Sequence, residues 1–365
     1  MKESSRPRAA GKPGRREVTG LRSGKLPADL LRRCLARIPH DDPRVVLWPA
    51  IGEDAAAIEF GERVLVAKTD PITFAADLIG WYAVNINAND VITCGAEPRW
   101  FMATVLLPEG APDSAAEDVF DQILRGCADL GVALVGGHTE VTPQVARPVV
   151  VGCMLGETDR QRLVTTAGAR VGDALLLTKG VAVEGTALLA REAAVELRAR
   201  GVGEETLRAA RELLFSPGIS VVPEARLLLE LGCVTAMHDP TEGGLATGLE
   251  ELAAASGQGL TVDEGEIFVL PQCSEICAAL DLNPLGLIAS GALLAAVTPG
   301  RVADALERLT RAGIRAGVIG EVRPPQDGLT LTSAGRTRPL PRFPRDEVAR
   351  YFASPAPAPK GGRRR

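Results

Sequence analysis

The chain has 365 residues, enough for two domains of ordinary size, and its 46% hydrophobic and 24% charged residues are typical of a soluble globular protein. Its formal net charge of -5 gives no support for a nucleic-acid-binding domain, so nucleic acid is not expected as a partner. No apolar run is long enough to span a membrane, and seven scattered cysteines are typical of reduced thiols in a cytoplasmic protein.

Basic residues gather at both ends of the chain, which are also rich in proline, glycine and serine. We expect residues 1–25 and 346–365 to be disordered basic tails. Between them, a change of composition at residues 157–172 predicts two domains, at 26–160 and 161–345. Weak contact of the tails with polyanions stays open, although a solvated tail is the preferred interpretation.

In the first predicted domain, short apolar strands alternate with helical patterns. The predicted elements in chain order are a helix at 26–38, a strand at 64–68, a helix at 78–94, a strand at 100–107, a helix at 115–130 and strands at 133–135 and 149–155. The second predicted domain begins with a strand at 173–178. Its further elements are helices at 186–200, 204–214 and 221–231, a strand at 234–237, a helix at 245–255 and strands at 259–262, 291–297 and 316–321. This alternation predicts α/β or α+β layers.

The segment His238-Asp239-Pro240-Thr241-Glu242-Gly243-Gly244 directly precedes the predicted helix at 245–255. A glycine turn that opens into a helix offers free N–H groups and the positive end of a dipole, which suit a phosphate. Asp239 and Glu242 would repel that phosphate unless a cation lay between them. The segment therefore predicts a metal–nucleotide site, and an ordinary helix cap is the alternative.

Other acidic residues follow strands or turns elsewhere, namely Glu53-Asp54, Asp70 and Asp90, and Gly136-Gly137 is predicted to form a second glycine turn before His138-Thr139-Glu140. Carboxylates collected from several loops are the ligands that Mg²⁺ requires. A single one is more often a cap or a solvated turn residue. Their recurrence in one chain favours a site, although spacing alone does not show that they converge.

Five segments together resemble the AIR synthase-related, PurM-like superfamily, which includes AIR synthase, thiamine-monophosphate kinase, selenophosphate synthetase and the hydrogenase maturation factor HypE. They are Gly52-Glu53-Asp54-Ala55-Ala56, Thr69-Asp70, Asn89-Asp90 with Gly95-Ala96-Glu97-Pro98, Gly136-Gly137-His138-Thr139 and Asp239-Pro240-Thr241-Glu242-Gly243-Gly244. The segment 239–246 and the strand Gly291-Ala292-Leu293-Leu294 are most similar to the HypE-like branch. The likeness covers about residues 40–325.

The resemblance implies a two-domain PurM-like fold of the α/β (α+β) class. Its N-terminal domain would pair with a second copy in a homodimer, through a barrel made from both sheets, and its C-terminal domain would be α/β. ATP and Mg²⁺ are the implied cofactors, and hydrogenase maturation is the implied context. Carried over by position, the implied metal ligands are Glu53, Asp54, Asp70, Asp90 and Asp239, the implied ATP contacts are Asn89, Gly136, Gly137, Thr139, Gly243 and Gly244, and the candidates for general base or substrate contact are His138, Glu140 and Glu242.

Three features depart from the relatives. Glu53 stands where several relatives have aspartate, and His138 stands where thiamine-monophosphate kinase has a metal-binding aspartate. The chain ends in Gly-Gly-Arg-Arg-Arg without the terminal reactive cysteine of HypE, and the Cys-Lys region of selenophosphate synthetase is missing from its start.

We therefore expect an ATP- and Mg²⁺-dependent enzyme that phosphorylates or activates an acceptor, either a small molecule or a group carried on a protein. The sequence does not identify that acceptor. The alternatives are a non-catalytic nucleotide-binding or maturation scaffold and a kinase similar to thiamine-monophosphate kinase. A reactive cysteine supplied by a partner protein also stays open.

Overall fold

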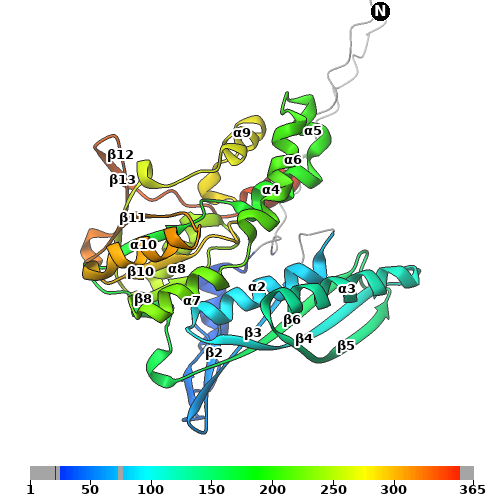
Figure 1. Cartoon of the computed structure of the whole chain (residues 1–365), viewed down its shortest axis with the longest axis horizontal. Helices are drawn as coiled ribbons and strands as arrows, with labels where there is room; N and C mark the ends of the chain where they lie inside the picture. Colours follow the sequence, from blue (N-terminus) through cyan, green and yellow to red (C-terminus); the bar gives the residue numbers. More distant parts are fainter. Residues whose placement is uncertain (1–20, 22–24, 73–76, 354–365) are drawn as a thin grey trace, which may run out of the picture.

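The computed structural model describes residue 21, residues 25–72 and residues 77–353. Within these ranges the strands form two sheets, one in each half of the chain (Figure 1). Helices pack on both sheets, so the predicted two-domain α/β (α+β) architecture is confirmed. None of the helices in the described ranges is both long enough and apolar enough to cross a lipid bilayer.

The first sheet has the strand order β1-β2-β3-β6-β4-β5. Only β4 and β5 run parallel among its described neighbours, and the other pairs are antiparallel. Its strands are β1 (Val45–Leu47), β2 (Ala56–Phe60), β3 (Arg63–Ile72), β4 (Glu97–Pro108), β5 (Ala133–Thr142) and β6 (Val149–Thr158). Buried and half-buried residues alternate along β6, as expected for a strand with one face covered more fully than the other.

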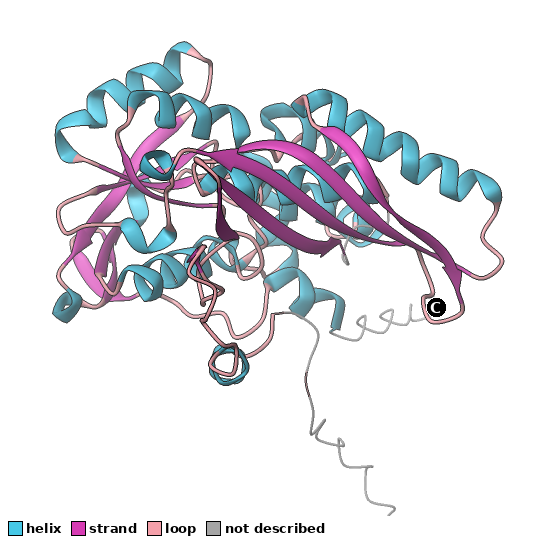
Figure 2. Ribbon diagram, turned by 90° about the horizontal axis from the view of Figure 1, so that it is seen from below, coloured by secondary structure: helices cyan, strands magenta, loops and turns pink. Residues whose placement is uncertain are grey.

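Two helices, α2 (Ile79–Thr93) and α3 (Asp113–Leu130), lie along one face of this sheet (Figures 1 and 2). Every residue of α2 is buried, because α2 contacts β6 on one side and α7 (Val222–Leu231) and β8 (Val234–His238) of the second half on the other. A helix covered on all sides is expected to be apolar all round. The polar residues of α2 therefore need partners or a function.

The second sheet has the strand order β13-β12-β9-β11-β7-β10-β8, with β12 and β9 parallel and the other neighbours antiparallel. Its remaining strands are β7 (Ala174–Thr178), β9 (Gly259–Asp263), β10 (Leu294–Val297), β11 (Ala316–Arg323), β12 (Leu329–Ser333) and β13 (Arg336–Pro339). The remaining α-helices in the described ranges are α1 (Ala28–Leu35), α4 (Val183–Glu192), α5 (Ala194–Ala199), α6 (Glu204–Glu212), α8 (Gly244–Ser256), α9 (Pro271–Leu280), α10 (Val302–Arg311) and α11 (Glu347–Ala353). β8 packs against α2, and this places the loop after β8 beside the first half.

Two predictions about the ends of the chain are wrong within the described residues. Residues 347–353, assigned to a disordered tail, form α11, in which Val348 and Ala349 are buried. Lys25, assigned to the other tail, forms an ion pair in which its Nζ lies 2.8 Å from Glu251 Oε1. Of the other residues in the predicted tails, the structure describes the exposed Leu21 and the buried Asp346, and the rest lies outside the described residues.

The predicted glycine turn at Gly136-Gly137 is also wrong. Both residues lie inside β5 and pair with Met102 and Ala103 of β4. Gly137 has φ +150°, and a Cβ atom there would lie 2.0 Å from the Ala103 carbonyl oxygen. Glycine is therefore needed because two strands approach closely, and not because the chain reverses direction.

Candidate functional site

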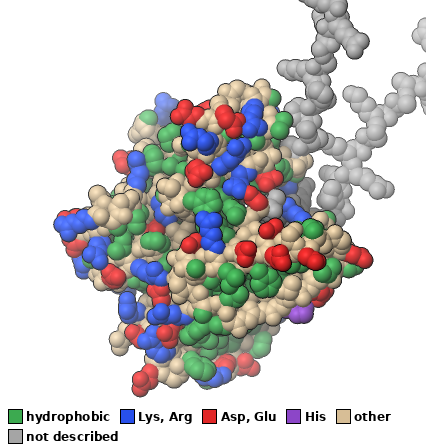
Figure 3. All heavy atoms as spheres, turned by 45° about the vertical axis from the view of Figure 1, so that its right-hand side comes forward, with side chains coloured by type: hydrophobic (Ala, Val, Ile, Leu, Met, Phe, Trp, Pro, Cys, Tyr) green, Lys and Arg blue, Asp and Glu red, His purple; other side chains and the backbone are tan. Residues whose placement is uncertain are grey.

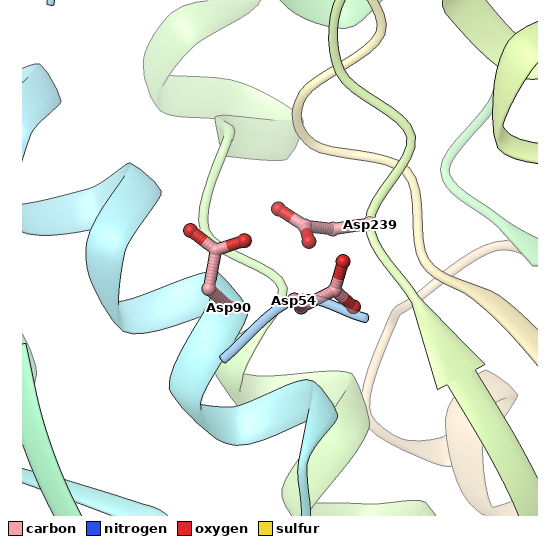
Figure 4. Close-up of side chains that lie close together, drawn as sticks. All are labelled: Asp54, Asp90 and Asp239. Atoms are coloured by element: carbon pink, nitrogen blue, oxygen red, sulfur yellow. The ribbon is translucent and has the colours of Figure 1, made fainter. Parts of the chain in front are cut away.

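Three aspartates from distant parts of the chain meet between the two halves. Asp54 precedes β2, Asp90 belongs to α2, and Asp239 directly follows β8. One carboxylate oxygen from each lies within 4.8 Å of the other two, and all three residues are buried. Figure 4 shows their carboxylates pointing toward one another. We call these three residues the aspartate cluster.

Several oxygens of the aspartate cluster have no hydrogen-bond partner. They are both carboxylate oxygens of Asp239 and Oδ2 of Asp90. Burial raises the pKa of Asp90 to about 7, and burial together with the neighbouring Asp90 raises the pKa of Asp239 well above its usual range. Buried carboxylate oxygens without partners are costly, and a divalent cation would offset that cost. Oxygen ligands of this kind fit Mg²⁺.

A lysine borders the aspartate cluster. Lys68 lies on β3, and its Nζ is 3.1 Å from Asp90 Oδ1 and 3.9 Å from Asp70 Oδ2. Residues two apart in a strand face the same side, so Lys68 and Asp70 point together toward α2. Lys68 was not predicted as a site residue, although its position two residues before Asp70 was the signal that could have identified it.

A second residue without a predicted role, His238, supports Asp54. Its Nδ1 lies 2.9 Å from Asp54 Oδ1, and its Nε2 lies 3.1 Å from Glu251 Oε2. Burial alone would lower the pKa of His238, but the carboxylates of Asp54 and Glu251 raise it well above its usual range. The hydroxyl of Thr93 donates to Asp54 Oδ2 at 3.2 Å. Asp54 is therefore held in one orientation from two sides.

Two of the proposed metal ligands lie outside the aspartate cluster. The Glu53 carboxylate accepts hydrogen bonds from the backbone N–H groups of Thr166 and Ala167, at 3.3 and 3.2 Å. Asp70 reaches toward Lys68, and 37% of its side chain is exposed, so it remains accessible to a ligand. In this arrangement Glu53 joins the first half to the segment before β7, while Asp70 extends the acidic surface around Lys68.

The side chain of Asn89 joins the two halves of the chain. Its Nδ2 donates to the Ile219 carbonyl at 2.9 Å, and its Oδ1 accepts from the Val221 N–H at 2.9 Å. Each end of the amide thus has a backbone partner, and a contact of Asn89 with ATP stays a prediction. In this structure Asn89 fixes the loop before α7 against α2.

We expect the Asn89→Ala variant to be destabilised by about 2–4 kcal/mol, because it leaves a buried carbonyl and a buried N–H without partners. Urea unfolding measures this loss. The Asn89→Asp variant is the matched control, since aspartate can accept from Val221 but cannot donate to Ile219. A variant Asn89→Ala as stable as the natural chain would contradict the joining role.

The predicted phosphate contacts at Gly243 and Gly244 also use their N–H groups inside the protein. The Gly243 N–H donates to Asp346 Oδ2 at 2.7 Å, and the Gly244 N–H donates to the Thr241 carbonyl at 3.0 Å. The helix α8 begins at Gly244, one residue before the predicted start at 245. The end of this loop therefore fits the alternative interpretation, an ordinary helix cap. Asp239, near the start of the loop, belongs to the aspartate cluster.

The remaining predicted residues lie in two other places. Glu242 is half-buried in the loop before α8, and burial raises its pKa. His138, Thr139 and Glu140 lie on the exposed strand β5, where His138 Nε2 is 3.4 Å from Glu140 Oε2. Among the described residues, no hydrogen bond or ion pair joins this trio to the aspartate cluster.

Comparison with known proteins identifies two family models along the chain. The AIR synthase related protein N-terminal domain matches residues 52–158, and the AIR synthase related protein C-terminal domain matches residues 170–331. Together the two matches include Asp54, Asp90 and Asp239.

Two curated relatives have different activities in their names. The carbamoyl dehydratase HypE of Cupriavidus necator is 32% identical over 286 residues, which cover 75% of this chain and 78% of the relative. The selenide, water dikinase of Nitratidesulfovibrio vulgaris is 31% identical over 355 residues, which cover 86% and 95%. A crystal structure of the hydrogenase maturation protein HypE in complex with ATP has a TM-score of 0.67 and 25% identity, and the match covers 87% of this chain and 96% of that chain.

Proposed function

The chain belongs to the AIR synthase related protein family, and from this we propose that it binds ATP with Mg²⁺ between its two halves and uses it to phosphorylate or activate an acceptor. The observation that carries the proposal is the convergence of Asp54, Asp90 and Asp239, with both Asp239 oxygens unpaired. The ATP complex of a HypE relative supports the choice of nucleotide.

In this proposal the aspartate cluster would hold Mg²⁺, and Asp70, which lies beside Lys68, stays a further candidate ligand. A bound magnesium ion would neutralise negative charge on the phosphates during phosphoryl transfer. His238 and Thr93 keep Asp54 in place, and Asn89 keeps α2 and α7 at a fixed separation. These residues position the cluster, so catalysis would rest mainly on placement and on electrostatic stabilisation.

The acceptor is not set by family membership. The relatives include a carbamoyl dehydratase and a selenide, water dikinase, so one fold serves different acceptors. We keep Glu242, which lies in the same loop as Asp239, as a candidate for acceptor contact or proton transfer. His138 and Glu140 are kept as candidates that would reach the site only through a second copy of the chain or a movement of β5.

We also propose a homodimer, formed along β5. This strand lies at the edge of the first sheet, and eight of its ten residues are exposed, including the large apolar Val135 and Val141. Figure 3 shows groups of hydrophobic side chains in the lower half of the view, at the level of the first sheet. An open edge strand with apolar residues is a ready surface for pairing with another strand. The mass of the full chain in solution, measured by light scattering, tests this, and a monomer would contradict it.

We propose that the protein is cytoplasmic. None of its seven cysteines forms a disulfide in the structure, and reduced thiols are typical of that compartment.

Calorimetric titration of the full chain with ATP, once with Mg²⁺ and once with a chelator, tests the nucleotide and metal parts of the proposal. We expect binding with Mg²⁺ and a loss of at least about tenfold in affinity without it. A screen of acceptors scored by ADP release then tests turnover. Equal binding in the chelator would contradict the metal site, and tight binding without turnover on any acceptor would favour the non-catalytic scaffold.

A further inference from the structure

Lys68 provides the aspartate cluster with a positive charge that belongs to the chain itself. Among the described residues, it is the one lysine or arginine whose nitrogen lies within 4.0 Å of Asp70 or Asp90. A lysine side chain is charged at neutral pH, and this ammonium lies 3.1 Å from Asp90 Oδ1 and 3.9 Å from Asp70 Oδ2.

Lys68 forms a hydrogen bond with one of the two carboxylate oxygens of Asp90 and leaves the other without a partner. Oδ1 of Asp90 accepts from the Lys68 ammonium at 3.1 Å, while Oδ2 has no partner. A divalent cation bound to the aspartate cluster would therefore share Asp90 with the ammonium. Two cations on one buried carboxylate repel each other strongly, so the lysine opposes the binding of a metal ion alone.

The lysine side chain is able to change partners. It is 21% exposed, and its only hydrogen bond in the described structure is the one to Asp90. An ammonium on four methylenes is a mobile point charge that binds phosphate well. When a metal arrives with a nucleotide, the negative charge of the phosphates is available to this ammonium.

We propose that Lys68 is a built-in counter-ion that makes the aspartate cluster select a metal–nucleotide complex over a free metal ion. This inference rests on the proposed function. In the chain without ligand, Lys68 neutralises Asp90 and Asp70. In the complex, its ammonium moves from Asp90 Oδ1 to a phosphate oxygen and leaves Asp90 to the metal ion. No covalent bond is formed or broken in this exchange.

The Lys68→Met variant tests the inference, because methionine keeps an unbranched side chain and removes the charge. Two affinities are measured by calorimetry on the full chain, one for Mn²⁺ alone and one for Mg²⁺ with a non-hydrolysable ATP analogue. We expect Mn²⁺ alone to bind about tenfold more tightly and the metal–nucleotide complex to bind at least about tenfold more weakly. The Lys68→Arg variant keeps the charge and should bind Mn²⁺ alone as weakly as the natural chain.

A change of both affinities in the same direction, or of neither, would overturn the inference, since a residue with a merely structural role would weaken both. If Lys68→Met does not fold, Lys68→Gln keeps a hydrogen-bond donor to Asp90 and is measured in the same way. Failure of the natural chain to bind the ATP analogue would refute the proposed function. The titration with Mn²⁺ alone would then still decide whether Lys68 opposes a free metal ion.

Discussion

Replacing Asp239 with asparagine is expected to weaken Mg²⁺-dependent binding of ATP by at least about 100-fold and to raise the stability of the metal-free chain. The gain in stability follows because both Asp239 oxygens are buried without partners next to Asp54 and Asp90. An asparagine carries no charge, and its amide can donate to a neighbouring carboxylate. We expect a gain of about 1–3 kcal/mol in the free energy of unfolding, measured by urea titration in the presence of a chelator.

Asp173 offers the matched control, since it is also a buried aspartate but its Oδ2 has partners. That oxygen accepts from the Arg170 N–H at 2.8 Å and from the Thr235 hydroxyl at 2.5 Å. The Asp173→Asn variant should lose stability and keep its affinity for Mg²⁺ and ATP. An Asp239→Asn variant that is destabilised as much as Asp173→Asn, and that still binds, would show Asp239 to be structural.

The aspartate cluster should also make the stability of the metal-free chain depend on pH. Asp90 has a pKa of about 7 in the folded chain, and Asp239 is shifted in the same direction, whereas unfolded aspartates lose their protons near pH 4. The folded state thus binds more protons between these values, so the free energy of unfolding falls as pH rises from about 4 to about 7. For Asp90 the fall is on the order of 4 kcal/mol.

Urea unfolding at several pH values, with a chelator and with saturating Mg²⁺, measures this slope. We expect Mg²⁺ to flatten it, because a bound metal displaces the protons. The Asp90→Asn variant should flatten it without any metal. A slope that is the same in this variant would assign the pH dependence to other groups.

Part of this site could be predicted from the sequence. Asp54 lies two residues after Gly52, Asp239 directly follows an apolar strand, and Asp90 is the one charged residue of the helix α2. A buried charge in such a helix requires a partner or a ligand. Their convergence was suggested only by the resemblance to the family, because spacing along the chain does not measure distances between Asp90 and Asp239 in space.

Other parts depended on residues far away in the chain. Whether the Gly243 N–H is free was decided by Asp346, 103 residues later and in a segment expected to be disordered. Asn89 has a side chain of the type that often contacts ligands, but here its amide forms hydrogen bonds with the backbone of residues 219–221. Gly136-Gly137 has the local signal of a turn, which pairing with β4 overrides. Local patterns do not contain this information, because tertiary contacts determine it.

Gly244 is a residue whose replacement should cost much stability without removing any polar group. Its φ is +68°, and a Cβ atom there would lie 2.5 Å from the Leu285 carbonyl oxygen and 2.7 Å from that of Leu287. These are backbone atoms, so they cannot turn aside as a side chain can. We expect Gly244→Ala to lose about 3 kcal/mol or more of stability, from left-handed strain and overpacking together.

Gly257, at the other end of α8, separates the two causes of that loss. It has the same φ of +68°, but a Cβ atom there would meet nothing within 4 Å. Gly257→Ala should therefore cost only the strain of a left-handed alanine, about 1 kcal/mol. The midpoints of urea unfolding give both losses of stability, provided that the slope of the unfolding free energy against urea concentration is the same in both variants.

The two variants should also differ in ATP binding. The Gly244 N–H donates to the carbonyl of Thr241, which lies two residues after Asp239. Gly244→Ala should therefore weaken ATP binding, while Gly257→Ala leaves it unchanged. Equal losses of stability in the two variants would mean that the backbone at Leu285 and Leu287 yields to the added methyl group, and that the position of Asp239 does not depend on close packing at Gly244.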